Sequence, residues 1–349
     1  MRLAASSMLR RVSLRKLGLF VLSLALFVLA LNLMKSGARG LVPMIRDWFH
    51  VTNPFNALGF GWLFAYVVMS GSPVAAAALT FYDVGAIDQM SAFAMITGSR
   101  LGASLIVLFI GMLYALRGHE RGKSLTMGLL SLTVTATTYL PALALGYLML
   151  GNGLFARTQV EAPISDPSRL DAPFKPVIEL GIRYLTEWGV FVVGMLVIVA
   201  SFNLFDKALP EMTLRDSALS GVPRLLYRPS VMFVAGLAFT AISMSVSISL
   251  GILVPLSARG YIRRENISTF VDTLLAGVLL GNPGAQAVVL VQMLSNVIVS
   301  VIILAFTLKL YERTILRLVE RLSTDMRLLA VFLTVILLVP LGLLFVGPK

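Results

Sequence analysis

Long apolar stretches separated by short polar connectors dominate the sequence. A helix needs roughly 20 apolar residues to cross the hydrocarbon core of a bilayer, and most of these stretches approach that length. The pattern therefore predicts an all-α polytopic membrane protein. The apolar segments fall near residues 17–34, 55–82, 91–116, 124–150, 186–205, 231–256, 267–281, 285–308 and 327–346.

The segment 55–82 is interrupted in its middle by the residues "MSGSP", Met69 to Pro73. Glycine weakens a helix by about 1 kcal/mol and proline by about 3 kcal/mol. Each half has about 13 residues, or roughly 20 Å at 1.5 Å per residue, which is too short to span the membrane. We expect a re-entrant helical hairpin over 54–83 with its tip at Ser70–Pro73. The second arm should start at Pro73, because proline favours the first turn of a helix.

The two halves of the chain resemble each other. The stretches "LGLFVLSLALFVLALNLM" (17–34) and "WGVFVVGMLVIVASFNLF" (188–205) share glycine, phenylalanine and asparagine at matching positions, and "MSGS" (69–72) matches "MSVS" (244–247). We therefore expect two inverted-topology repeats, over 17–150 and 181–308, each made of a span, a re-entrant hairpin and two further spans. The second hairpin is expected over 230–256. Inverted repeats are typical of secondary transporters.

The remaining segments surround these repeats. With the N-terminus in the cytoplasm, most lysines and arginines lie on the inner side, as the positive-inside rule requires. The first span exceeds a signal-peptide core and no A-x-A-like site follows it, so we expect it to be retained. We expect the protein to lie in the plasma membrane, as a bacterial inner-membrane protein. The other segments are a basic cytoplasmic N-terminus (1–16), a proline-rich extracytoplasmic loop (151–180), a cytoplasmic amphipathic helix (309–326) and a final span (327–349).

Composition narrows the classes of function. Hydrophobic residues make up 58% of the chain and charged residues 13%, with a formal net charge of +12. The basic residues cluster at the ends of apolar runs, so the charge reflects membrane topology, and we expect no nucleic-acid partner. The chain has no cysteine, which excludes disulfides and thiolate metal sites. Common catalytic motifs are absent, so we do not expect an enzyme or a cofactor.

Hydroxyl groups mark both expected hairpin tips. Ser70, Gly71 and Ser72 lie at the first tip, and Ser245 and Ser247 at the second. Free backbone N–H groups at a helix start bind anions, and serine hydroxyls can donate to the same anion. Alternatively, the serines only satisfy neighbouring helix backbones. Two clusters at matching positions favour anion binding.

On these features the chain resembles the type II sodium/phosphate cotransporters and their bacterial relatives. Members carry a Gln-Ser-Ser-Ser motif in each hairpin; here Met69 and Met244 replace the glutamines, and Gly71 and Val246 the central serines. Further similar stretches are the tail of the first span ("NLMKSGARGL"), "GAIDQMSAFAMITGSRLGASL" (85–105) and "QMLSNVI" (292–298). The resemblance covers most of residues 17–308 and implies a form without the soluble C-terminal domain of many bacterial relatives.

The resemblance implies secondary active transport of a small oxyanion, with inorganic phosphate as the first candidate, by alternating access. Sodium is the coupling ion it implies, and membrane lipid and a second copy of the chain are the other expected partners. Two alternatives stay open: a transport-inactive relative that serves as a membrane assembly partner, and a transporter of a less polar solute. The residues expected to bind the coupling ion are Thr97, Ser99, Asp272, Thr273 and Asn296. Asp272 is a carboxylate in a largely apolar segment, and it could instead carry a proton.

Arg100 is the most informative charge. It lies inside the segment 91–116, between Gly98 and Gly102, where the family has asparagine. Burying an ionisable residue in a span is costly, so such a residue is a functional candidate. It can hold a tetrahedral oxyanion by bidentate donation and replace a bound cation. Alternatively, it forms a structural ion pair with Asp83 or Asp272.

Overall fold

The computed structural model describes residues 14–49, 51–116, 121–153, 155, 172–208, 273, 276–277 and 279–346. Every regular element in this part of the chain is helical, which confirms the all-helical prediction for it. Among the described residues, six helices are long and apolar enough to cross a membrane, so the chain is a multi-pass membrane protein. These spans are Gly18–Trp48, Gln89–Phe109, Gly128–Gly151, Glu187–Phe205, Pro283–Thr307 and Met326–Leu343.

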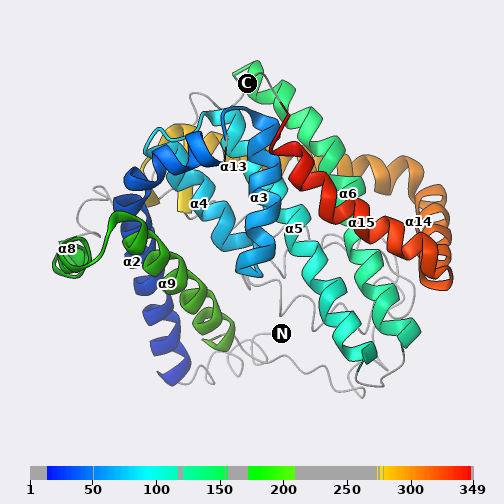
Figure 1. Cartoon of the computed structure of the whole chain (residues 1–349), viewed down its shortest axis with the longest axis horizontal. Helices are drawn as coiled ribbons and strands as arrows, with labels where there is room; N and C mark the ends of the chain where they lie inside the picture. Colours follow the sequence, from blue (N-terminus) through cyan, green and yellow to red (C-terminus); the bar gives the residue numbers. More distant parts are fainter. Residues whose placement is uncertain are drawn as a thin grey trace, which may run out of the picture.

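The helices α2 (Leu14–Pro43) and α9 (Glu187–Ala208) form an antiparallel pair at one side of the molecule (Figure 1). The Oγ of Ser201 donates to the carbonyl of Ser23 at 2.7 Å near one end of the pair. Near the other end, a Cβ on Gly37 would overlap the backbone of Phe191. The first spans of the two expected repeats therefore pack directly on each other. A short π-helix, Met44–Trp48, continues α2.

Two short helices, α3 (Pro54–Val68) and α4 (Gly71–Asp83), occupy the interrupted segment. They meet at Met69, which has a left-handed φ of 55°, and at Ser70, which is extended. The second helix therefore starts at Gly71, and its expected start at Pro73 is wrong. Pro73 lies in the first turn all the same, where a missing N–H breaks no helical hydrogen bond. Re-entry of this pair into the membrane stays a prediction.

The long helices α5 (Gln89–Leu116) and α6 (Arg121–Gly151) form the centre of the fold. Residues 91–102 of α5 are buried without interruption, as expected for a helix surrounded by other helices. Helix α3 crosses α5 so closely that a Cβ on Gly61 would overlap the carbonyl of Met95. A Cβ on Gly98 would likewise overlap the carbonyl of Leu58. Small residues allow this close approach of membrane helices.

The C-terminal part consists of α13 (Pro283–Ile302), a π-helix (Ile303–Thr307), α14 (Leu308–Thr324) and α15 (Met326–Leu343). Helix α13 packs on α5 and α6, and α15 on α3. The Nδ2 of Asn56 in α3 donates to the carbonyls of Leu343, Leu344 and Val346 at 2.8–3.0 Å. Asn56 thereby satisfies carbonyl groups at the end of α15 that the helix itself leaves open.

Helix α14 is amphipathic. Its side chains Ile315, Val319 and Leu322 are buried, and it packs on α6 and α15. The hydroxyls of Tyr311 and Thr137 share a hydrogen bond of 2.7 Å. Burial raises the pKa of Tyr311, and this hydrogen bond offsets part of the rise, so the phenol stays protonated at neutral pH.

The expected loop 151–180 contains regular structure that the sequence analysis missed. A 3-10 turn, Ala172–Phe174, leads into the helix α8 (Lys175–Tyr184), which lies beyond the α2–α9 pair (Figure 1). The prolines around it favoured a loop, but Pro176 lies in the first turn of α8, where proline is tolerated.

The glycine contacts give a first prediction. Replacing Gly98 with alanine should lower the free energy of unfolding by about 1–3 kcal/mol, because α3 and α5 would be forced apart. Gly18 is a matched control, since a Cβ there meets nothing within 4 Å. Gly18→Ala should leave stability unchanged or raise it by up to about 1 kcal/mol. Thermal unfolding of both variants in detergent measures this, and equal effects of the two would refute the close crossing.

Candidate functional site

The guanidinium of Arg100 lies inside the molecule. Its side chain is 5% exposed, and it is the only charged residue among the buried ones in the described part of the chain. Its Nη1 donates to the Oγ of Ser72 at 3.3 Å, and its Nη2 to the Oγ1 of Thr273 at 2.7 Å. The contact with Ser72 comes from the first turn of α4, and that with Thr273 from the segment preceding α13. Three separate parts of the chain therefore meet at this one charge.

The first turn of α4 reaches Arg100 because Gly71 lies directly on α5. A Cβ at Gly71 would be 2.9 Å from the carbonyl oxygen of Ser99 and 3.1 Å from the Cβ of Ala103. A larger residue would push the turn, and Ser72 with it, away from α5. Ser70 is the N-cap residue of α4, but its side chain makes no capping hydrogen bond. The first N–H groups of a helix have no partner within it and carry partial positive charge.

A cluster of fully buried polar side chains lies where α5 faces α13. The Oγ1 of Thr97 is 3.0 Å from the Oε1 of Gln292 and 3.1 Å from the carbonyl of Phe93. The Nδ2 of Asn296 donates to the carbonyl of Gln292 at 3.0 Å. Two atoms of this cluster, the Nε2 of Gln292 and the Oδ1 of Asn296, have no hydrogen-bond partner among the described residues.

The sequence analysis did not identify Gln292 as part of a site. The signal was present, because Gln292, Ser295 and Asn296 recur at the spacing of one helix face in an otherwise apolar span. All three are fully buried. The Oγ of Ser295 donates to the carbonyl of Gln292, so its hydroxyl is satisfied within its own helix.

The structure brings together some of the expected site residues. Ser72, Arg100 and Thr273 share hydrogen bonds, and Thr97 contacts the helix that carries Asn296. Ser99 donates to the carbonyl of Ile96 at 2.7 Å, within its own helix. Because Thr273 accepts from a guanidinium, a sodium ion at the same oxygen would meet a competing cation. Three expected site residues lie outside the described residues: Ser245 and Ser247 of the second expected hairpin (230–256), and Asp272.

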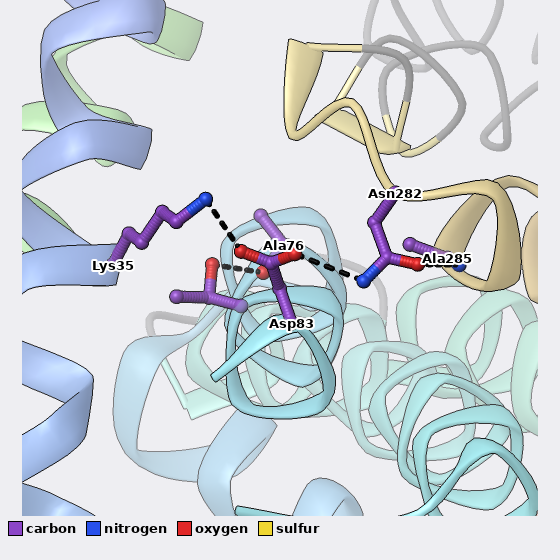
Figure 2. A network of polar contacts seen from close by, with 6 residues as sticks. Lys35, Ala76, Asp83, Asn282 and Ala285 are labelled. Carbon is purple, nitrogen blue, oxygen red and sulfur yellow. Dashed lines mark hydrogen bonds and ion pairs between the residues drawn. The ribbon is translucent and has the colours of Figure 1, made fainter. Parts of the chain in front are cut away.

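Asp83 belongs to a second polar network, at the far end of α4 (Figure 2). Its Oδ2 is 2.7 Å from the Nζ of Lys35 in α2, and its Oδ1 accepts from the Nδ2 of Asn282 at 2.9 Å. The Oδ1 of Asn282 in turn accepts from the backbone N–H groups of Gly284 and Ala285, and so caps α13. The alternative that Asp83 neutralises Arg100 is therefore wrong. Asp83 instead connects α2, α4 and α13.

A carboxylate at the C-terminus of a helix is disfavoured by the helix dipole. Asp83 is the last residue of α4, so it depends on Lys35 and Asn282 for its stabilisation. The network fixes the end of α4 that lies away from Arg100. Helix α4 is thus held by polar contacts at both ends.

Comparisons of the chain with models of protein families, with curated proteins and with solved structures gave no match. The function must therefore be inferred from the chemistry of the site itself. Among the described residues, no group of three or more His, Cys, Asp or Glu side chains could hold a metal ion. A buried guanidinium, hydroxyl groups and a helix start instead form a set of donors, which suits an anion.

The Asp83 network gives a second prediction. Lys35→Met and Asp83→Asn should each destabilise the protein, and a double-mutant cycle should show a coupling of about 1–2 kcal/mol, because Asp83 is mostly buried while Lys35 is partly exposed. Thermal or denaturant unfolding of the three variants measures the coupling. Lys309→Met, at an exposed lysine of α14, is the control for removing a positive charge. Additive effects of the two substitutions would contradict a direct ion pair.

Proposed function

We propose that the protein is a secondary active transporter of a small oxyanion in the plasma membrane, with inorganic phosphate as the leading substrate. The observation that carries the proposal is the buried charge of Arg100, in contact with Ser72 of α4 and with Thr273. A charge inside a membrane span is costly and is kept where it serves a function.

The chemistry around Arg100 favours an oxyanion over other solutes. A guanidinium presents planar, paired N–H donors that match two oxygens of a tetrahedral anion. The first turn of α4 adds backbone N–H groups and the hydroxyl of Ser72 on the same side. Gly71 keeps this turn against α5, so all of these donors stay close together.

Transport rests on the resemblance to the type II sodium/phosphate cotransporters and on the arrangement of the helices. Two inverted repeats are related by an axis in the membrane plane, so equivalent helices of the repeats run antiparallel. The helices α2 and α9, whose sequences resemble each other, are such an antiparallel pair. In this proposal α3 and α4 form a re-entrant hairpin, and Ser245 and Ser247 of the second hairpin complete the site.

Arg100 also bears on ion coupling. A fixed guanidinium supplies permanently the positive charge that a cotransported sodium ion supplies in the family that the chain resembles. We therefore propose that transport here needs less sodium than in that family, or none. A proton gradient is then the natural alternative energy source to compare.

Uptake of radiolabelled phosphate into proteoliposomes tests the proposal, with a sodium gradient, with potassium only and with a pH gradient. We expect saturable uptake that Arg100→Gln weakens roughly 10–100-fold in apparent affinity, the range for a lost hydrogen bond to a charged group. Ser72→Ala should weaken the apparent affinity less than Arg100→Gln does, because this substitution removes only one hydroxyl group.

Ser104→Ala is the matched control for these variants. Ser104 is buried on the same helix as Arg100, but its hydroxyl bonds to the carbonyl of Leu101 in its own helix. The Ser104→Ala variant should therefore leave phosphate uptake unchanged. Absence of uptake under every gradient, from protein shown to be folded, would refute phosphate transport. Thermal stabilisation by other solutes would then separate a transporter of a different solute from an assembly partner.

A further inference from the structure

The side-chain amide of Gln292 can be placed in two orientations that fill the same space. Thr97 has one hydroxyl hydrogen but two acceptors within reach, the carbonyl of Phe93 and the Oε1 of Gln292. If the amide is turned over, its Nε2 donates to Thr97, and the hydroxyl of Thr97 is free to donate to Phe93. This orientation makes one more hydrogen bond. It leaves the Oε1 of Gln292 in the position that has no partner.

Two carbonyl oxygens of side chains are then left without a donor, on Gln292 and on Asn296. The two residues lie one turn apart on the same face of α13, and both are fully buried. A buried acceptor with no donor costs about 1–3 kcal/mol. A ligand that carries hydrogen-bond donors would relieve this cost.

These acceptors adjoin the Arg100 site. Thr97, which contacts Gln292, lies three residues before Arg100 on α5, and side chains at this spacing are neighbours on a helix. The site thus has donors at Arg100 and Ser72 and acceptors on α13. Arg100 is the only buried charged residue in the described part of the chain, so these side chains supply at most one positive charge.

We propose that the site takes the singly charged, protonated form of an oxyanion, such as dihydrogen phosphate. Arg100 and Ser72 bind its unprotonated oxygens, and the side-chain carbonyls of Gln292 and Asn296 accept hydrogen bonds from its hydroxyl groups. A doubly charged anion would leave a net negative charge in the membrane interior, which is costly. Sulfate is excluded twice, because it is doubly charged and has no hydroxyl group. This inference rests on the proposed function.

The test compares phosphate uptake at fixed total concentration on both sides of neutral pH, where phosphate changes from its singly to its doubly charged form. Uptake at subsaturating phosphate should fall as the pH rises, and the apparent KM should be constant when expressed as dihydrogen phosphate. Arsenate, which has the same hydroxyl groups, should compete. A large excess of sulfate should not.

Among the described residues, titratable side chains on the helices around the site have partners of their own. Asp83 and Lys35 pair with each other at the far end of α4, and the hydroxyl of Tyr66 on α3 donates to Ile336 of α15. We therefore expect the pH dependence to follow the protonation of the ligand.

Gln292→Met removes the acceptor at nearly constant volume. The variant should weaken the apparent affinity for phosphate roughly tenfold, because one hydrogen bond to a charged ligand is lost. It should also reduce the discrimination against sulfate. Gln286→Met is the matched control, because Gln286 is a buried glutamine of the same helix. It should keep both the affinity and the selectivity. If Gln292→Met fails to fold, the pH series and the sulfate competition of the unaltered protein still test whether the substrate is the protonated, singly charged anion.

Three outcomes would overturn the inference. Uptake that follows the doubly charged anion, or that sulfate inhibits as well as arsenate, leaves a transporter but refutes the protonated substrate. A Gln292→Met variant with unchanged affinity and selectivity would show that the side-chain carbonyl of Gln292 does not bind the substrate. No uptake at any pH refutes the proposed function, and this inference with it.

Discussion

Burial of a guanidinium in an otherwise apolar helix is the constraint on which the site depends. Residues 91–102 of α5 have no exposed face, so Arg100 cannot reach solvent and must find its hydrogen-bond partners among the packed helices. One of them is the hydroxyl of Ser72, which lies in the first turn of α4, where the first backbone N–H groups have no partner within the helix. The helix break at Met69 and Ser70 therefore has a direct structural use.

Close packing makes these contacts possible. The glycines Gly61 and Gly98 let α3 lie directly on α5, and Gly71 does the same for the first turn of α4. The opposite end of α4 is held by Asp83, through Lys35 of α2 and Asn282 of α13 (Figure 2). Any movement of α2 with its partner α9 relative to the centre of the fold must change this network. The same helix thus joins the surroundings of Arg100 to the helix pair at the side of the molecule.

A permanent charge and an exchangeable cation have different consequences for a transporter. A bound sodium ion brings its charge into the site together with the substrate and leaves with it, so its gradient can drive the cycle. A guanidinium stays in place, and the empty site then carries the charge when it reorients. In this proposal the hydroxyl groups of Ser72 and Thr273 accept hydrogen bonds from Arg100 in that empty state, as they do in the structure.

The sequence alone determined the six described spans and the break, but not the short helix α8. Hydropathy located the spans because each helix must present an apolar surface of membrane length, and the residues 69–73 marked a break because glycine and proline destabilise a helix locally. The rarity of a charge within a span singled out Arg100. Only the tertiary structure decided the partners. Thr273 is 173 residues away from Arg100, and Asp83 pairs with Lys35, not with Arg100. Helix α4 begins at Gly71 because Ser70 is extended. These contacts depend on how the helices cross, and local patterns of polarity fix the apolar faces but not the crossings.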